Sequence, residues 1–306
     1  MNRSSLLSAL AVAAVSAPAF AQPAHFGLIQ SSDTVAYDPF LSGGNRGAGE
    51  YTAGTDMRTM GAAAFGWQPA GFTTIDGFGL AHSGSTGNFV ANALGEDSAL
   101  VTSELGGRMQ WLGVGNFPFN RNITRQLNAT PSSSEWWYSV QVNRLGWVDP
   151  PAADNSTFVV GGFTDAGGNG LQVGYSDEAG DGSPDLVLRT NGTNFVLDAD
   201  TSSSDNYLVL TKLTVDTLGN DLIEVFIDQD PDALGAADFT LATEDVTNSL
   251  TPFTQSKYES PGQSGVIFWD EVTLATSLDG IVNVPEPASL ALLGLGGLAF
   301  ARRRRA

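Results

Sequence analysis

Short runs of alternating apolar and polar residues, separated by turn residues, fill the chain between residues 22 and 283. Clusters of Gly, Ser, Thr, Asn and Asp end these runs, and no long stretch there has the 3.6-residue period of a helix. This pattern predicts many short strands in a sandwich or a barrel. The strands that we expect are 35–40, 72–80, 108–114, 136–145, 157–164, 170–176, 186–190, 207–215, 222–228 and 266–275.

Alternation also assigns side chains to faces, because successive side chains of a strand point to opposite sides of the sheet. One face of strand 136–143 is apolar and is expected in the core: Trp136, Tyr138, Val140 and Val142. Its other face carries Trp137, Ser139, Gln141 and Asn143. In strand 266–275 the pattern places Phe268, Val272 and Leu274 on one face and Trp269 on the other. Strand 207–215 is apolar on both faces, so we expect it to be central and covered on both sides.

The first 21 residues have the three parts of a secretory signal peptide. Arg3 supplies the positive start, residues 6–15 form an apolar run, and Ala19 and Ala21 make the small-x-small cleavage pattern. We therefore expect signal peptidase to release a mature chain that begins at Gln22.

The last residues, 284–306, contain three features in order: the motif Pro285-Glu286-Pro287, an apolar stretch at 288–301, and a basic cluster of Arg302, Arg303, Arg304 and Arg305. The apolar stretch is shorter than the roughly 17–25 residues of a relaxed membrane helix. An arginine cluster behind such a span stays in the cytoplasm, which leaves the domain outside. This tail resembles the PEP-CTERM sorting signal of Gram-negative bacteria. The resemblance implies a short transmembrane helix held transiently in the inner membrane, processing by an exosortase, and a setting rich in extracellular polysaccharide.

The remaining segment, 22–283, is long enough for one large β domain. Its composition excludes several kinds of chemistry and of binding partner. The chain has no cysteine, which excludes disulfides and thiol chemistry. Without Arg3, Glu286 and the four tail arginines, nine basic and 32 acidic residues remain, a net charge near −23. Such a charge argues against nucleic acid and anionic lipid as partners, because both require basic surfaces.

A second resemblance covers residues 33–280. Five pieces carry it, in this order along the chain: 35–40, 64–67, the aromatic strand 135–142, the pair 206–213 and 222–227, and the closing strand 269–276. These pieces resemble concanavalin A-like, laminin G-like domains. The resemblance implies an all-β jelly-roll sandwich of two antiparallel sheets whose first and last strands are neighbours. Domains of this kind often bind glycans or mediate adhesion.

Two candidate binding sites follow from the residues. Trp137 with Gln141 and Asn143 places an aromatic ring and two amides on one face, as sugar recognition requires. Alternatively, loops cover this face and Trp137 belongs to a second core. Asp228, Asp230 and Asp232 have the spacing that begins a calcium loop, although Phe239 replaces the glutamate at the twelfth position. Turn chemistry alone also explains such aspartates. Calcium is the one cofactor that we consider.

Catalytic patterns are not evident. No strand carries the paired carboxylates of a glycosidase on one face. The two histidines, His25 and His82, lack the surroundings of a catalytic triad or of a zinc site. We therefore expect an exported, non-enzymatic cell-surface or matrix protein with a structural or adhesive role and weak glycan binding. The alternatives are a polysaccharide-degrading or -modifying enzyme of the same fold and a calcium-dependent adhesion module.

Overall fold

The computed structural model describes residues 32–38, 73–74, 88–90, 108–112, 121–146, 158–177, 182–203, 205–260 and 266–281. The predicted signal peptide (1–21) and the sorting tail (284–306), with its expected hydrophobic helix, lie outside the described residues. Within these ranges no helix is long and apolar enough to cross a membrane.

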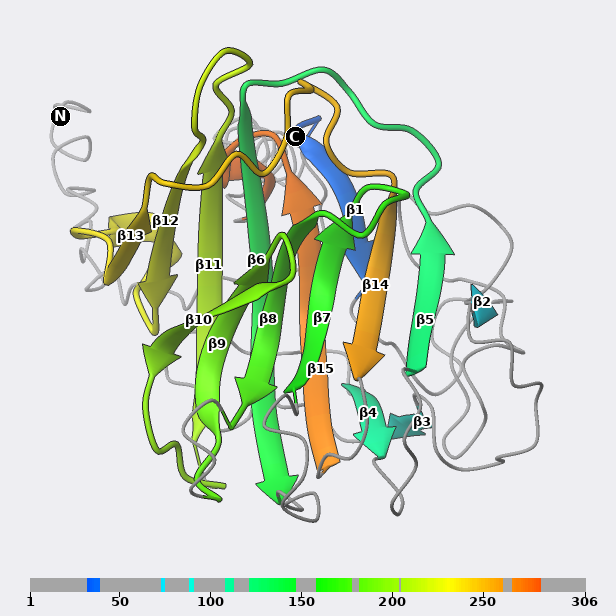
Figure 1. Cartoon of the computed structure of the whole chain (residues 1–306), viewed down its shortest axis with the longest axis vertical. Helices are drawn as coiled ribbons and strands as arrows, with labels where there is room; N and C mark the ends of the chain where they lie inside the picture. The colour runs from blue at the N-terminus through cyan, green and yellow to red at the C-terminus, as the bar shows by residue number, and fades with distance from the viewer. Residues whose placement is uncertain are drawn as a thin grey trace, which may run out of the picture.

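Eight strands form the first sheet, in the order β13-β12-β11-β6-β15-β4-β3, with β1 also paired to β15 (Figure 1). All of its ladders are antiparallel. Because β1 pairs with β15, the first and last described strands are neighbours, as the resemblance implied. The bounds are β13 Phe239–Leu241, β12 Leu222–Ile227, β11 Asn206–Thr214, β6 Glu135–Gly146, β15 Val266–Ala275, β4 Arg108–Leu112, β3 Asn88–Val90 and β1 Thr34–Asp38.

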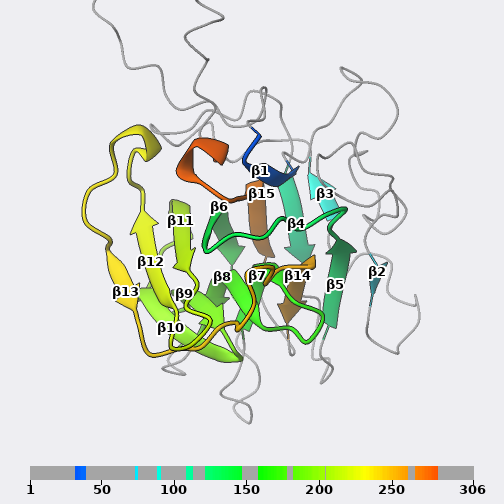
Figure 2. The ribbon, with the colours of Figure 1, turned by 90° about the horizontal axis from the view of Figure 1, so that it is seen from above.

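The second sheet has seven antiparallel strands in the order β10-β9-β8-β7-β14-β5-β2. Figure 2 shows it as a separate layer facing β11, β6 and β15 of the first sheet. Its bounds are β10 Thr193–Asp198, β9 Asp185–Thr190, β8 Gly170–Ser176, β7 Phe158–Thr164, β14 Gln255–Ser260, β5 Arg121–Gln126 and β2 Thr73–Thr74.

The predicted fold class, an all-β sandwich of two antiparallel sheets, is confirmed. The strand order is that of a jelly roll, because late strands return between early ones: β14 lies between β5 and β7, and β15 lies between β4 and β6. Two short 3-10 turns, η3 (Pro231–Ala233) and η4 (Leu278–Gly280), complete the described elements.

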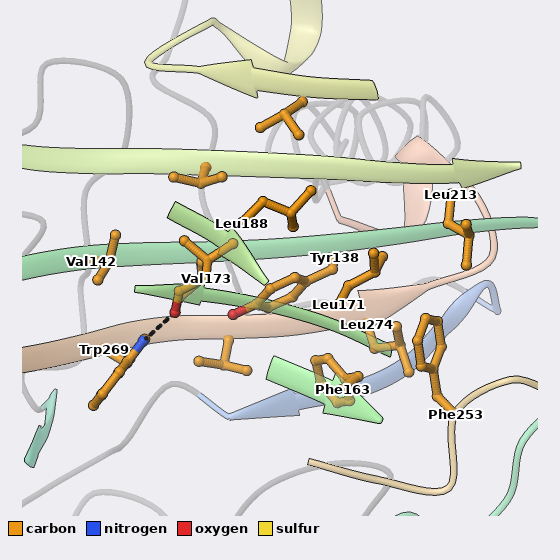
Figure 3. Close-up of a cluster of buried hydrophobic side chains, with 14 of the residues drawn as sticks. Tyr138, Val142, Phe163, Leu171, Val173, Leu188, Leu213, Phe253, Trp269 and Leu274 are labelled. Atoms are coloured by element: carbon orange, nitrogen blue, oxygen red, sulfur yellow. Dashed lines mark hydrogen bonds between the residues drawn. The ribbon is translucent and has the colours of Figure 1, made fainter. Parts of the chain in front are cut away.

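The core lies between the two sheets and contains the apolar face predicted for β6: Trp136, Tyr138, Val140 and Val142. Figure 3 shows side chains of both sheets meeting there, among them Phe163, Leu171 and Leu188 from the second sheet. Two buried polar groups find backbone acceptors across the core. The Trp269 indole N–H donates to the Val173 carbonyl at 3.1 Å, and the Tyr138 hydroxyl donates to the Gly161 carbonyl at 2.9 Å. These bonds fix the two sheets against each other.

A β-bulge in β15 corrects one predicted face. The register passes from Asp270 opposite Gln141 to Thr273 opposite Ser139, so β15 has one residue more than β6 between these pairs. Glu271 takes the left-handed conformation, with φ 51°, at this point. The extra residue turns the strand, and Trp269 therefore faces the core together with Val272 and Leu274. The prediction that placed Trp269 on the opposite face from these two is wrong, because simple alternation assumes a regular ladder.

Candidate functional site

The structure places the three predicted sugar-binding residues on one face of β6, but it buries them. Trp137 is 5% exposed, Gln141 3% and Asn143 7%. The Asn143 amide donates to the Asp205 carbonyl at 2.8 Å, which is a structural role. No ring face of Trp137 is therefore open for a sugar to stack on, and the hypothesis of an outward sugar-binding face around it needs correction.

Trp137 belongs to a second apolar cluster on the outer side of the eight-stranded sheet. It stacks on Phe226, with ring centroids 6.0 Å apart and planes inclined by 20°. Its indole N–H donates to Glu135 Oε1 at 2.7 Å. Segments near η3 and η4 cover the cluster, whose members are Trp137, Leu208, Leu210, Phe226, Ala275 and Ile281, with Leu234, Ala237 and Leu278 packed against them. This is the arrangement of the alternative interpretation, in which Trp137 lies in a second core.

Trp137→Phe should therefore lower stability and leave carbohydrate binding unchanged. We expect the free energy of unfolding to fall by about 1–2 kcal/mol, because the smaller ring loses packing and the bond to Glu135. Urea unfolding and a polysaccharide-binding assay on the same preparation measure both quantities. Lost binding at unchanged stability would restore Trp137 as a ligand contact.

The aspartates of the predicted calcium loop are engaged by the backbone. Asp228 Oδ1 accepts from the Leu208 N–H at 2.8 Å, and Asp230 Oδ1 accepts from the Asp232 N–H at 3.0 Å, where Asp230 caps η3. Desolvation raises the pKa of Asp228; the Leu208 N–H opposes this shift, and the nearby carboxylates of Asp198 and Asp205 reinforce it. Across the described ranges, no three His, Cys, Asp or Glu side chains form a group that could hold a metal ion. These aspartates thus follow the turn-chemistry interpretation.

A different polar cluster lies on the outer face of the seven-stranded sheet, and sequence reasoning missed it. It consists of Arg189 on β9, Asn194 on β10, and Lys257 and Glu259 on β14, and we call it the Arg189 network. Glu259 Oε2 lies 2.6 Å from Lys257 Nζ, and its Oε1 lies 3.7 Å from Arg189 Nε. Arg189 Nη1 donates to Asn194 Oδ1 at 2.8 Å. The three charged side chains are 16–18% exposed, so most of each side chain is buried.

The strand register explains why these side chains meet. Residues directly opposite each other run across the sheet in one row: Asn194, Arg189, Gln172, Gly162 and Lys257. Glu259 follows Lys257 by two residues and so shares its face. The Arg189 guanidinium lies 3.9 Å from the centroid of the Phe158 ring. The ring and the two neighbouring strands therefore position the charged head of Arg189.

One contact of this network, between Arg189 and Asn194, could have been predicted from the sequence. Asn191 and Gly192 both take positive φ, 48° and 78°, in the two-residue turn that joins β9 to β10. Asn-Gly between two strand-like runs is the strongest short hairpin signal, and it would have placed Asn194 opposite Arg189. Strand β14 offered no such signal, because Tyr258 is its one apolar residue.

Comparison with known proteins supports the sorting tail. The family model for the PEP-CTERM protein-sorting motif matches residues 283–305, which confirms the motif predicted from Pro285-Glu286-Pro287 and the basic cluster. A search of curated proteins finds no match for the chain.

Solved structures with a similar fold have low identity. The cellulose-induced protein Cip1 is 13% identical over 63% of this chain and 87% of its own, with a TM-score of 0.39. An endo-β-1,4-glucuronan lyase from the fungus Trichoderma reesei is 11% identical over 69% and 97%, with a TM-score of 0.38. The alginate lyase Aly36B is 13% identical over 55% and 80%, with a TM-score of 0.35. At such low identity and TM-score, neither the activity nor the ligand of these proteins can be assigned to this chain. The chain is thus an exported protein with a two-sheet β-sandwich and a C-terminal PEP-CTERM motif, which implies exosortase processing and membrane-anchored transit.

Proposed function

We propose that this exported protein binds polysaccharide at the cell surface or in the extracellular matrix, without cleaving it, and serves a structural or adhesive role. The Arg189 network on the outer face of the seven-stranded sheet carries this proposal. The sorting motif supports a location outside the inner membrane, since an arginine cluster behind a short apolar span stays in the cytoplasm.

The network has the chemistry that sugar hydroxyls need. A hydroxyl both donates and accepts hydrogen bonds, and the Arg189 network offers strong donors beside an amide and a carboxylate. Its side chains stand on strands rather than on loops. The Arg189 guanidinium contacts the Phe158 ring and donates a hydrogen bond to Asn194. Such support keeps the donors in place before a ligand arrives, which lowers the entropic cost of binding.

The same geometry favours binding over hydrolysis. Glycosidases use two carboxyl groups separated by about 5–9.5 Å. Among the described contacts of the Arg189 network, Glu259 is the one carboxylate, and it forms ion pairs with two cations. No described feature favours the polysaccharide-degrading alternative or the calcium-dependent one.

Arg189→Met should weaken polysaccharide binding at least 10-fold. Methionine keeps an apolar chain against Phe158 but removes the charge and the bond to Asn194. The test uses the full chain purified in detergent, with affinity measured against a panel of immobilised polysaccharides. Urea unfolding of each variant verifies that it is folded.

Lys212→Met is the matched control. Lys212 is likewise half-buried, lies 5.6 Å from the centre of the Trp137 ring, and pairs with two carboxylates, but it stands on the outer face of the other sheet. We expect its binding to equal that of the wild type. Equal losses in the two variants, or a wild type that binds no polysaccharide in the panel, would overturn the proposed function.

A further inference from the structure

We infer that one end of the sandwich docks on the outer surface of the membrane while the sorting tail is anchored there, and that Leu218 and Leu250 enter the interface of the bilayer. The inference goes beyond the proposed function, because docking needs no polysaccharide. Three observations lead to it: two exposed leucines at one end of the domain, the lack of charge in the loops around them, and the place where the chain leaves the sandwich.

Among the described residues, three large apolar side chains are exposed, and two of them lie at the same end. Leu218 is 97% exposed and Leu250 38%, whereas Val196, 41% exposed, stands on the edge strand β10. Leu218 lies in the turn between β11 and β12, and hydrogen bonds fix the backbone of this turn. The Leu218 N–H donates to Asp216 Oδ1 at 3.0 Å, and the Asp216 N–H donates to the buried Asp221 at 2.8 Å. A turn held in this way keeps the Leu218 side chain pointing into solvent.

The two leucines belong to one continuous surface, because backbone hydrogen bonds join the loops that carry them. The Val215 N–H donates to the Ser134 carbonyl, and the Ser133 N–H donates to the Leu250 carbonyl, both at 2.9 Å. Figure 1 shows the joined loops at the upper end of the sandwich. We call this surface the leucine end; its three loops are 127–134, 215–221 and 247–254.

The leucine end carries little charge for such an acidic domain. Loops 127–134 and 247–254 contain no charged residue, although 15% of the whole chain is charged. An uncharged loop can approach lipid closely, because no charge has to be desolvated. The exposed carboxylates of Asp216 and Asp245 flank these loops, and anionic lipid would repel them. The surface that fits is therefore a zwitterionic bilayer, which apolar side chains bind without the help of basic residues.

The chain leaves the described part of the domain at this same end. Strand β15 runs toward it (Figure 1), and Ala275, the last residue of β15, pairs with Trp137 near the start of β6. After η4 and Ile281, six residues, 282–287, precede the apolar stretch at 288–301. Fully extended, six residues reach roughly 20 Å. The leucine end is thus held close to the bilayer during the membrane-anchored transit that the sorting motif implies. A short tether also raises its effective concentration at the surface, so that weak apolar contacts suffice.

The test reconstitutes the full chain into phosphatidylcholine vesicles that contain a lipid with an energy-transfer acceptor on its headgroup. Because the chain has no cysteine, Thr217→Cys and Ser203→Cys each provide a single site for a donor fluorophore. Thr217 is next to Leu218, and Ser203 precedes β11 at its opposite end, about 30 Å away along the nine residues of the strand. In chains that float with the vesicles, we expect transfer from position 217 to exceed that from position 203 by about 2-fold or more. Equal transfer from the two positions would overturn the inference.

Replacing both leucines, Leu218→Ser with Leu250→Ser, separates docking from tethering alone. In the chain labelled at position 217, transfer should fall by about 2-fold, because the tether by itself lets the leucine end move away from the lipid. Val196→Ser is the matched control, an equally exposed apolar side chain on β10, and it should change nothing. Replacing about a third of the lipid by phosphatidylglycerol should lower transfer, since the acidic domain is repelled. Unchanged transfer in the double variant would overturn the inference, as would an equal loss in Val196→Ser or a rise on the anionic lipid.

Discussion

Deleting Thr273 from β15 should unfold the sandwich, whereas deleting Glu271, two residues earlier, should leave it folded. At the bulge, β15 has one residue too many for the ladder with β6, and Glu271, with φ 51°, is the residue in the strained conformation. Without Glu271 the strand regains plain alternation, and Trp269, Val272 and Leu274 all still point inward. Without Thr273 the alternation after Val272 is reversed. Leu274 then leaves the core and Ala275 enters it.

The expected costs differ because only one deletion exposes the core. Loss of Leu274 from a fully buried position should cost about 4 kcal/mol or more, with further loss where β1 pairs with this end of β15. Loss of Glu271 removes the acceptor of the Tyr37 hydroxyl and should cost about 1–3 kcal/mol. Far-ultraviolet circular dichroism and urea unfolding of both deletion variants measure this difference. A Glu271 deletion as damaging as the Thr273 deletion would show that the bulge itself is needed for the fold.

The sequence allowed the strong strands and the fold class to be predicted because their side chains alternate clearly. Strands β6, β8, β11 and β15 lie within a residue of their predicted limits. Strand β11 is also central and buried on both sides, as its apolar character on both faces predicted. These strands carry most of the core, so the sandwich follows from them.

Strands β5 and β14 were not predicted because their alternation is masked by polar residues on the inner face. Ser256 lies opposite Phe163 in the register, Arg125 lies opposite Ser256, and both polar side chains are almost completely buried. A pattern that assumes an apolar inner face does not find such strands. The Arg189 network was missed for the same reason, since two of its members, Lys257 and Glu259, stand on β14.

The open face hypothesised around Trp137 is covered in the structure, for a different reason. Alternation correctly separated Trp137 from Trp136, but it cannot tell a face open to solvent from one covered by a turn. Here the covering residues, among them Leu234 and Ile281, come from η3 and η4, far from Trp137 in sequence. Periodicity within one strand contains no information about such distant contacts.

Asp221 is a buried carboxylate that holds two loops together, although no sequence pattern singled it out. Its Oδ1 accepts from the Asp216 N–H at 2.8 Å, and its Oδ2 accepts from the N–H groups of Val246 and Thr247 at 2.9 and 3.0 Å. The side chain thus connects the turn between β11 and β12 with the segment that follows β13. Desolvation raises the pKa of Asp221 above its ordinary value, and the three backbone donors only partly oppose this shift.

Asp221→Asn should lower the free energy of unfolding by about 3 kcal/mol at pH 7, because the amide NH₂ replaces one acceptor and faces backbone donors that then lack a partner. The exposed Asp216, whose Oδ1 accepts from the Leu218 N–H, is the control, and Asp216→Asn should cost less than about 1 kcal/mol.

Because the folded pKa of Asp221 is raised, the folded state binds more protons than the unfolded state between the unfolded pKa, near 3.9, and the folded pKa. The contribution of Asp221 to the free energy of unfolding is therefore greatest below the unfolded pKa, and it decreases as the pH rises from the unfolded to the folded pKa. The stability difference between wild type and Asp221→Asn, measured by urea unfolding at pH 4, 5 and 7, should accordingly increase toward low pH. A difference that shrinks toward low pH would instead mean that the three N–H donors outweigh burial and that the folded pKa is lowered.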